Sequence, residues 1–195
     1  MKEVLIPLLM ERFGARMDET ARDLSLVVEA SQLHPLVAFL RGEWAFDMLV
    51  DVVGVDYLGM AEHTGPRFGV LYNLKSMSHG SRRLRLKVLL EEENPSVPTL
   101  SDLYAIADWQ EREVWDQYGI VFAGHPNLRR LLNHVEFEGH PLRKDYPVHK
   151  RQWLSANDGM LDQLEQRLET LGYRVIERSP EILPDYEERL HGSIK

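Results

Sequence analysis

Residues 82–90 are RRLRLKVLL, in which aliphatic side chains fill the even positions from 84 and basic side chains fill positions 83, 85 and 87. Successive side chains of a β-strand point to opposite faces, so this alternation separates an apolar face from a basic one. It predicts a half-buried antiparallel strand. Residues 67–76 have the composition of a second strand, and residues 77–81 join the two as a hairpin.

Two further strands are predicted before this hairpin. Residues 45–57 are apolar and rich in valine, which favours a mostly buried strand, and Gly54 within it predicts a bulge. Residues 24–29 have the pattern of a short strand. The segment 94–98, which contains two prolines, is expected to end the sheet.

Apolar residues at three- and four-residue steps predict helices on both sides of these strands. The first covers residues 4–13 and stops at Gly14; the second covers residues 33–40, with Pro35 in its first turn and Gly42 just past its end. A third is expected to be capped by Thr99 and Asp102 and to end at Gly119. A leucine stripe at 161–171 predicts a fourth, followed by a short strand at 173–176.

Composition limits what the chain can do. With 44% hydrophobic and 28% charged residues among 195, it can bury a core, and we expect one globular domain with an appended tail. Cysteine is absent, which removes disulfides, thiolate nucleophiles, zinc ribbons and the ordinary iron–sulfur ligand sets. The formal charge is -8 with scattered basic residues, which argues against nucleic acid or anionic lipid as a partner.

The sequence offers no membrane segment of its own. No apolar run reaches the roughly 18 residues that a spanning helix needs. The first residues carry one lysine and a short apolar patch, but no secretory cleavage pattern follows. We therefore expect a soluble cytoplasmic protein that reaches a membrane only through a partner.

The most informative stretch is EREVWDQYGIVFAGHPNLRR at residues 111–130, with GHPLRKDYP at residues 139–147. Asp108, Arg112 and Asp116 stand four apart, so that they can pair along one face of a helix. Each such pair contributes only ~0.2–0.5 kcal/mol to the stability of a helix. Helix stability therefore does not explain why so many charged residues gather in this stretch. Part of this charge is therefore expected to serve something outside the helix.

The loop that follows is basic within an acidic protein. Arg129, Arg130, Arg143 and Lys144 outnumber the carboxylates between residues 128 and 146. Arginine forks suit carboxylates on a neighbouring chain, where bidentate pairing fixes the register. The alternative from the charge pattern alone is a solvated surface loop.

The two blocks resemble the signature of the C-type subunit of respiratory complex I, the NADH-quinone oxidoreductase. The match covers more than twenty positions, and a weaker resemblance extends upstream through DVVGVDY at residues 51–57 and the segment 94–100. It fades before Met17 and after about Val148. Two departures are visible: Gln117 replaces a usual apolar residue, and the segment 133–136 is looser than the family pattern.

The resemblance implies an α+β fold, with helices packed on a mixed, largely antiparallel sheet and an extended C-terminal tail. Residues 1–150 would form the domain with the signature, and residues 151–195 a C-terminal helix and tail that contact neighbouring subunits. It implies a non-catalytic structural and assembly subunit of the peripheral arm at the cytoplasmic face of the cell membrane. FMN and iron–sulfur clusters would belong to partner subunits. The chief partners would be the D-type subunit, which is related to hydrogenase large subunits, and the adjacent cluster-bearing subunits.

No residue is expected to be catalytic or to bind a cofactor or metal. The positions expected to carry the motif and the subunit interface are Glu111, Arg112, Glu113, Asp116, Gly119, Phe122, Gly124, His125, Pro126, Arg129, Arg130, Gly139, His140, Pro141, Arg143, Lys144, Asp145, Tyr146 and Pro147.

Three alternatives compete with this interpretation. His125, His134, His140 and His149 could form a metal site, although they lack the helical spacing of a zinc protease, and a histidine in a turn can cap backbone instead. Glu111 with Glu113, or Asp116 with His125, could act as acid and base, although residues two apart on a helix point to different faces. The third is the equivalent subunit of a related membrane-bound hydrogenase or formate hydrogenlyase.

Overall fold

A five-stranded sheet forms the frame of the computed structural model, which describes residues 2–18, 24–61, 63–78, 82–148 and 155–173. Its strands are β1 (Arg16–Met17), β2 (Ser25–Val27), β3 (Met48–Asp56), β4 (Phe68–Ser76) and β5 (Arg82–Leu90), in the order β1-β2-β5-β4-β3. Only β2 and β5 run parallel; the other neighbours are antiparallel. The predicted mixed, largely antiparallel sheet is confirmed.

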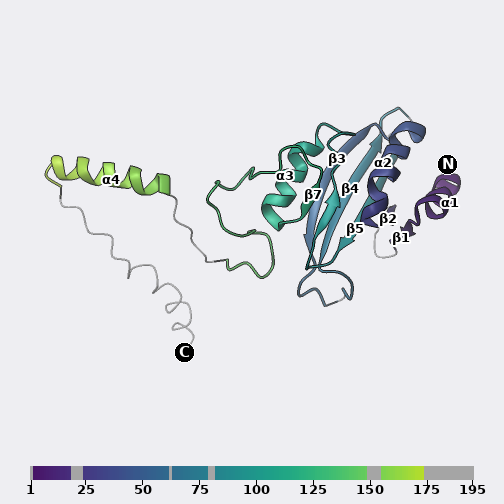
Figure 1. The fold of residues 1–195 in the computed structure, drawn as a ribbon, viewed down its shortest axis with the longest axis horizontal. Coiled ribbons are helices and arrows are strands. Elements are labelled where there is room, and N and C mark those ends of the chain that lie inside the picture. Colours follow the sequence, from purple (N-terminus) through teal and green to yellow (C-terminus); the bar gives the residue numbers. More distant parts are fainter. Residues whose placement is uncertain (1, 19–23, 62, 79–81, 149–154, 174–195) are drawn as a thin grey trace. The chain divides into compact units, whose positions relative to one another are not determined.

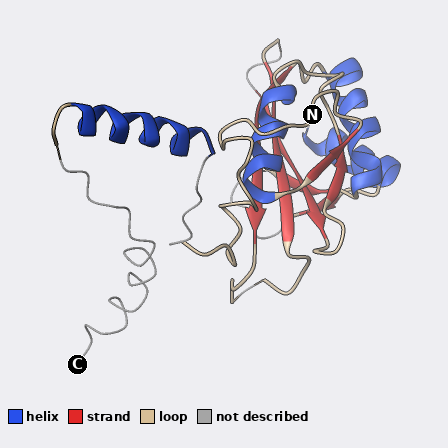
Figure 2. Cartoon of the chain, turned by 60° about the vertical axis from the view of Figure 1, so that its left-hand side comes forward, coloured by secondary structure: helices blue, strands red, loops and turns tan. Residues whose placement is uncertain are grey.

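Helices and a second, smaller sheet surround this frame (Figures 1 and 2). They are α1 (Lys2–Phe13), α2 (Ala30–Trp44), β6 (Ser96–Pro98), α3 (Ala107–Tyr118) and β7 (Val121–Ala123), with β6 and β7 paired in parallel. The chain divides into two units, residues 1–150 and residues 151–195, and the second contains α4 (Ser155–Thr170). The predicted α+β class is confirmed.

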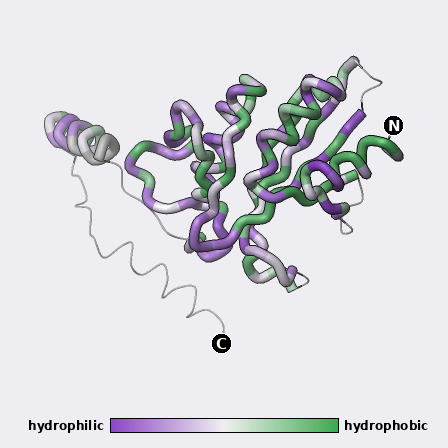
Figure 3. The backbone as a smooth tube through the Cα atoms, turned by 45° about the vertical axis from the view of Figure 1, so that its right-hand side comes forward, coloured by the Kyte–Doolittle hydropathy of each residue, from purple (hydrophilic) through white to green (hydrophobic). Residues whose placement is uncertain are grey.

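One face of the sheet builds the core. Cross-strand partners such as Val52, Tyr72 and Leu86 match in register, so their side chains share this face. It carries the buried residues Val52, Phe68, Val70, Tyr72, Leu74, Leu84, Leu86, Val88 and Leu90. The leucines and valine of α2 that line the same cluster are fully buried, and apolar segments gather on the strands and on α1 and α2 in Figure 3.

The opposite face of the sheet is partly exposed and carries polar and charged side chains among half-buried aliphatic ones. Asp51, Asn73 and Arg85 stand in one cross-strand row, and the Arg85 Nε donates to the Asn73 Oδ1 at 2.9 Å. This is the alternation that residues 82–90 predicted.

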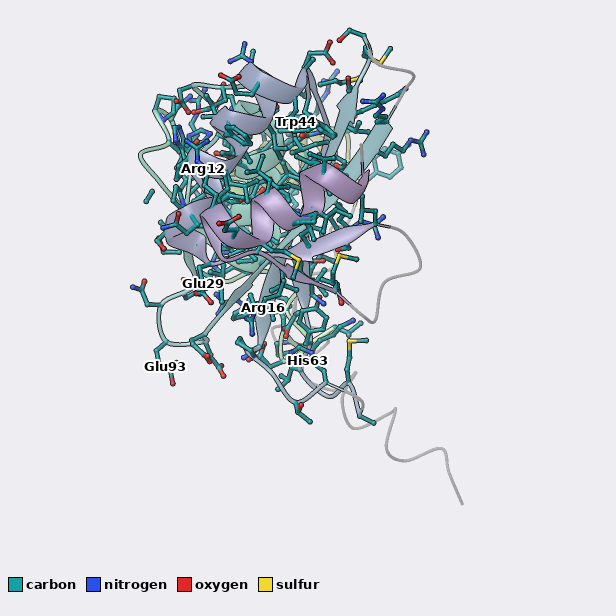
Figure 4. The ribbon with its side chains drawn as sticks, turned by 90° about the vertical axis from the view of Figure 1, so that its right-hand side faces the viewer. Arg12, Arg16, Glu29, Trp44, His63 and Glu93 are labelled. Carbon is teal, nitrogen blue, oxygen red and sulfur yellow. The ribbon has the colours of Figure 1, made fainter. Side chains whose placement is uncertain are left out.

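At the N-terminal side of the domain, the Arg12 guanidinium lies 4.6 Å from the centre of the Phe39 ring and connects α1 with α2. Arg16 pairs with Glu29 at 4.0 Å (Figure 4).

Two glycine predictions are wrong. Gly54 pairs in regular register with Val70, and the irregularity of β3 lies between Leu49 and Asp51. A Cβ at Gly54 would stand 2.6 Å from the Tyr118 ring, so this glycine instead allows α3 to approach β3 closely. Gly42 lies inside α2, because the helix continues to Trp44 and ends at Ala45 with a left-handed backbone.

The predicted boundaries of two helices also differ from the structure. Helix α2 begins at Ala30, which places Pro35 beyond the first turn. Helix α3 begins only at Ala107, so Thr99 and Asp102 do not cap it. The Thr99 hydroxyl binds Glu111 instead, and Asp102 binds His34 at 2.8 Å. Residues 96–98 leave the main sheet as predicted, but they form β6 rather than an irregular segment.

The second unit contains the predicted late helix, which begins at Ser155, earlier than the leucine stripe indicated. Most of the strand predicted at 173–176, and the whole tail from Pro180, lie outside the described residues. Among the helices that the structure describes, none combines the length and apolarity needed to cross a membrane.

Candidate functional site: the cap on helix α3

Asp116, near the end of α3, is the centre of the signature region. Its Oδ1 accepts from Arg130 Nη1 at 2.9 Å and from Asn133 Nδ2 at 3.1 Å. Its Oδ2 accepts from the backbone N–H groups of Leu131, Leu132 and Asn133 at 3.1, 2.8 and 2.9 Å. Burial acts to raise the pKa of Asp116, but the hydrogen bonds from Arg130 and Asn133 outweigh it and lower the pKa to about 2.

The last four carbonyls of a helix have no partner within the helix. In α3 each is bound by a residue that follows the helix. The Trp115 carbonyl accepts from the Gly119 N–H at 2.8 Å, and the Asp116 carbonyl accepts from Arg130 Nη1 and from the His140 ring, both at 3.1 Å. Because a carbonyl only accepts, the His140 Nδ1 must carry the hydrogen.

The remaining two carbonyls are bound by the second signature block. The Leu142 N–H donates to the Gln117 carbonyl at 3.1 Å, and the Arg143 Nε donates to the Tyr118 carbonyl at 2.6 Å. The Arg143 guanidinium also lies 5.0 Å from the centre of the Phe68 ring in the core. A cation at the C-terminus of a helix is favourable to the helix dipole. We call residues 128–148 the cap loop, because they close this helix end.

Gly119 lets the cap loop approach. Its φ of +73° lies in the left-handed region that favours glycine, which confirms the predicted end of the helix. A Cβ at this position would stand 2.5 Å from Arg143 Nη2 and from the His140 ring. Both the backbone conformation and the space around it therefore call for glycine.

A second cluster connects the cap loop with the sheet. Arg67 binds Asp56 through two bonds, Nε to Oδ1 at 3.1 Å and Nη2 to Oδ2 at 2.9 Å, and it also binds Asp145 at 2.7 Å and pairs with Glu92. The Lys144 N–H donates to Asp56 Oδ2 at 2.9 Å. Burial acts to raise the pKa of Asp56, but the Arg67 and backbone hydrogen bonds lower it overall. Sequence reasoning missed Asp56 and Arg67 as parts of this site.

Arg112 supports the cap loop from the side of α3. Its Nε and Nη2 donate to the carbonyls of Arg129 and Arg130 at 3.3 and 3.1 Å, and its guanidinium lies 5.2 Å from the centre of the Trp109 ring. The predicted pairing of Arg112 with Asp108 and Asp116 along the helix is therefore wrong among the described residues. The arginine binds backbone instead.

Glu111 and Glu113 have opposite environments, because they lie two residues apart on the helix. Glu113 is exposed, whereas Glu111 is fully buried. Glu111 accepts from the Thr99 hydroxyl and from the Leu100 N–H at 2.7 Å, and thereby fixes the turn before α3. Burial is the main cause that raises its pKa to about 7, against the effect of these hydrogen bonds.

The raised pKa of Glu111 predicts a pH dependence of stability. The folded chain holds this proton more tightly than the unfolded chain, where the pKa is 4.5. The stabilisation is complete below pH 4.5 and is lost as the pH rises through 7. Glu111→Gln keeps a neutral side chain of the same shape. We expect wild type to lose roughly 2–3 kcal/mol relative to this variant between about pH 5 and about pH 8.

Thermal melting at several pH values measures this difference. Glu113→Gln is the matched control, because it makes the same substitution at an exposed position of the same helix. Parallel curves for wild type and Glu111→Gln would show that the buried carboxyl does not hold the proton.

The other signature positions lie in and around the cap. Phe122 is buried in the core, and Gly124 and Gly139 have positive φ, with the Tyr146 ring packed where a Gly139 side chain would be. Pro126 and Pro141 lie in turns, and Pro147 lies outside the helices and strands. Arg129 and Lys144 have exposed side chains.

Two of these histidines, His125 and His140, bind backbone groups. The His125 Nδ1 accepts from the Asn127 N–H at 3.0 Å, so that Nε2 carries the hydrogen and donates to the Asp108 carbonyl at 3.1 Å. The His134 ring packs edge-on against Phe137. Within the described part of the chain, no group of three or more histidine or acidic side chains is arranged to hold a metal ion, and His149 lies outside that part.

The proposed acid–base pairs are not assembled by the fold. Glu111 and Glu113 face different surroundings, and Asp116 and His125 bind separate segments of the chain. Chemically, the arrangement of the signature residues binds a loop to a helix end.

A family model described as the 30 kDa subunit of respiratory-chain NADH dehydrogenase matches residues 26–152. The chain belongs to this family. The C-type subunit of the NADH-quinone oxidoreductase of Paramagnetospirillum magneticum is 45% identical over 128 residues, which are 65% of this chain and 61% of that protein. The same subunit of Burkholderia multivorans is 43% identical over 154 residues, covering 75% of this chain and 76% of that one. The resemblance seen in the signature blocks is confirmed.

A solved structure of Nqo5, a trypsin-resistant fragment (1-134) in a P63 form, superimposes with a TM-score of 0.59 at 32% identity. It covers 66% of this chain and 100% of that fragment, and it supports the α+β assignment. The chain spans about 61% of the length of the Paramagnetospirillum relative.

Proposed function

We propose that this chain is a non-catalytic structural subunit of the peripheral arm of a proton-translocating NADH:quinone oxidoreductase. In that enzyme electrons pass from NADH through FMN and iron–sulfur clusters to quinone, and these groups belong to partner subunits. One observation carries the proposal. The charged residues of the signature close the end of α3 and attach the cap loop to the sheet in this family member. They build a scaffold rather than a reaction centre.

The sequence supports the absence of a redox centre in this chain. None of its 195 residues is cysteine, so it lacks the thiolates that ordinarily hold iron–sulfur clusters. The relatives named NADH-quinone oxidoreductase favour the respiratory enzyme over the hydrogenase alternative.

The proposed partners are the D-type subunit, which is related to hydrogenase large subunits, and the adjacent cluster-bearing subunits, at the cytoplasmic face of the membrane. The second unit supports this role. Met160, Leu164 and Leu171 in and after α4 are exposed, and a helix in a protein gains most of its stability from the packing of its apolar side chains. We propose that residues 151–195 gain such packing from neighbouring subunits.

Deleting the chain tests this function. We expect membranes from the deletion strain to lose the assembled enzyme and NADH:quinone activity, and the wild-type gene to restore both. The purified chain, by contrast, should stay colourless after anaerobic reconstitution with iron and sulfide. A normal complex without the chain, or a stoichiometric cluster on it, would contradict the proposal.

A further inference from the structure

The cap loop turns its polar groups inward and several aliphatic side chains outward. Leu132, Val135 and Leu142 are 64%, 90% and 51% exposed, while the guanidinium groups of Arg130 and Arg143 face the helix end. Surface loops ordinarily show the reverse distribution. Single exposed aliphatic residues are normal, but several in one loop indicate a surface that another molecule covers.

The backbone holds the two leucines in this position. The Leu132 N–H is bound to Asp116 Oδ2 at 2.8 Å, and the Leu142 N–H is bound to the Gln117 carbonyl at 3.1 Å. Because Asp116 and Gln117 are neighbours in α3, both leucines are anchored at the same helix end. Turning either side chain inward would break bonds of the cap, so the exposed apolar surface follows from the fold.

Two of the four basic residues of the loop, Arg129 and Lys144, remain available to bind a partner. Arg130 and Arg143 bind Asp116 and the Tyr118 carbonyl, whereas the side chains of Arg129 and Lys144 are exposed and form no ion pair among the described residues. The two glutamates of the same loop, Glu136 and Glu138, have interactions of their own. The outer surface of the cap loop therefore combines apolar side chains with two positive charges that pair with no carboxylate in the part of the chain that the structure describes.

We infer that Leu132, Val135 and Leu142, with Arg129 and Lys144, form a docking surface for a neighbouring protein subunit. The complementary surface is apolar at its centre and bears carboxylates opposite the two cations. The inference rests on the proposed structural function and deepens it, because it separates docking residues from the signature residues that fold the cap.

Charge favours a different protein as the partner over a second copy of this chain or a membrane. A second copy of the chain would bring like cations together across a twofold axis, since such an interface places the same patch on both sides. The chain carries a net charge of -8, which opposes stable binding to an anionic membrane. A subunit with a carboxylate-bordered apolar surface meets neither difficulty.

Hydroxyl-radical footprinting of the tagged chain, purified alone and within the assembled enzyme, tests the docking surface. We expect oxidation of Leu132, Val135 and Leu142 to fall several-fold in the enzyme. Equal oxidation in both samples would overturn the inference. So would protection that appears in the isolated chain as its concentration rises, or on adding vesicles of anionic phospholipid, since these outcomes point to a second copy or to lipid.

Charge reversal provides the second measurement. The double variant Arg129→Glu with Lys144→Glu should lower the assembled fraction roughly tenfold or more at unchanged melting temperature. Arg83→Glu, at an exposed position on β5, is the matched control and should assemble normally. Normal assembly of the double variant would overturn the inference. If wild type itself fails to assemble, the proposed function fails; if it assembles with an accessible loop, only the docking surface does.

Discussion

Asp116→Ala is expected to produce the largest loss of stability of any single change in the signature, about 3–5 kcal/mol. The substitution removes the acceptor for Arg130, for Asn133 and for three backbone N–H groups at once. It also leaves the Arg130 guanidinium, which is mostly buried, without its carboxylate. The whole free energy of unfolding of a protein domain is only about 5–15 kcal/mol. Urea denaturation measures the effect.

Glu113→Ala is the matched control for Asp116→Ala, because both remove a carboxylate from α3. Glu113 is exposed, and its loss should change stability by no more than about 0.5 kcal/mol. Similar values for the two variants would mean that Asp116 does not organise the cap loop.

Gly119→Ala is expected to have the second largest effect. An alanine in the left-handed region costs about 1–2 kcal/mol, and its Cβ would displace Arg143 and His140 from their positions at the helix end. The His140 ring is fixed by its bond to the Asp116 carbonyl and by its edge contact with Trp115. The cap must therefore open, with the loss of further hydrogen bonds.

Gly14→Ala separates the two contributions. Gly14 also has a positive φ, +64°, but nothing lies within 4 Å of the place that an alanine Cβ would take there. It should show the backbone cost alone, so we expect Gly119→Ala to exceed it by roughly 1–2 kcal/mol in chemical denaturation. Equal costs would indicate that no packing depends on the absence of a side chain at Gly119.

The sequence predicted those features that local pattern controls. The alternation in residues 82–90 set the register of a strand with one buried face, and Gly119 ended α3 because a left-handed residue closes a helix. The two signature blocks also identified the segments that meet at this helix end. In these cases the necessary information lies within one or two turns of chain.

Long-range partners could not be predicted in the same way. Helical spacing predicted that Arg112 would pair with Asp116, yet each binds a loop residue instead, Asp116 to Arg130 and Arg112 to backbone carbonyls. An ion pair along a helix contributes a few tenths of a kcal/mol, whereas leaving the carbonyls of a buried helix end without donors costs more. A cluster of basic residues in the loop that follows a helix-ending glycine could have indicated a cap.

Asp56 and Arg67 show a further limit. Asp56 ends one strand and Arg67 precedes the next, so their pairing follows from the hairpin of β3 and β4. Their bonds to Lys144 and Asp145 join positions 88 and 78 residues apart, which no periodic pattern records. The burial of Glu111 was missed for the same reason, because its partner Thr99 lies outside the helix.

Amide hydrogen exchange in wild type and Asp116→Ala tests most directly whether the signature blocks form one cap on α3. We predict that the N–H groups of Leu132, Asn133 and Leu142 exchange slowly in wild type, and that all three exchange faster in the variant. Leu142 decides the outcome, because it binds the Gln117 carbonyl and not the Asp116 side chain. Fast exchange of Leu142 in wild type, or slow exchange unchanged in Asp116→Ala, would contradict a single cooperative cap.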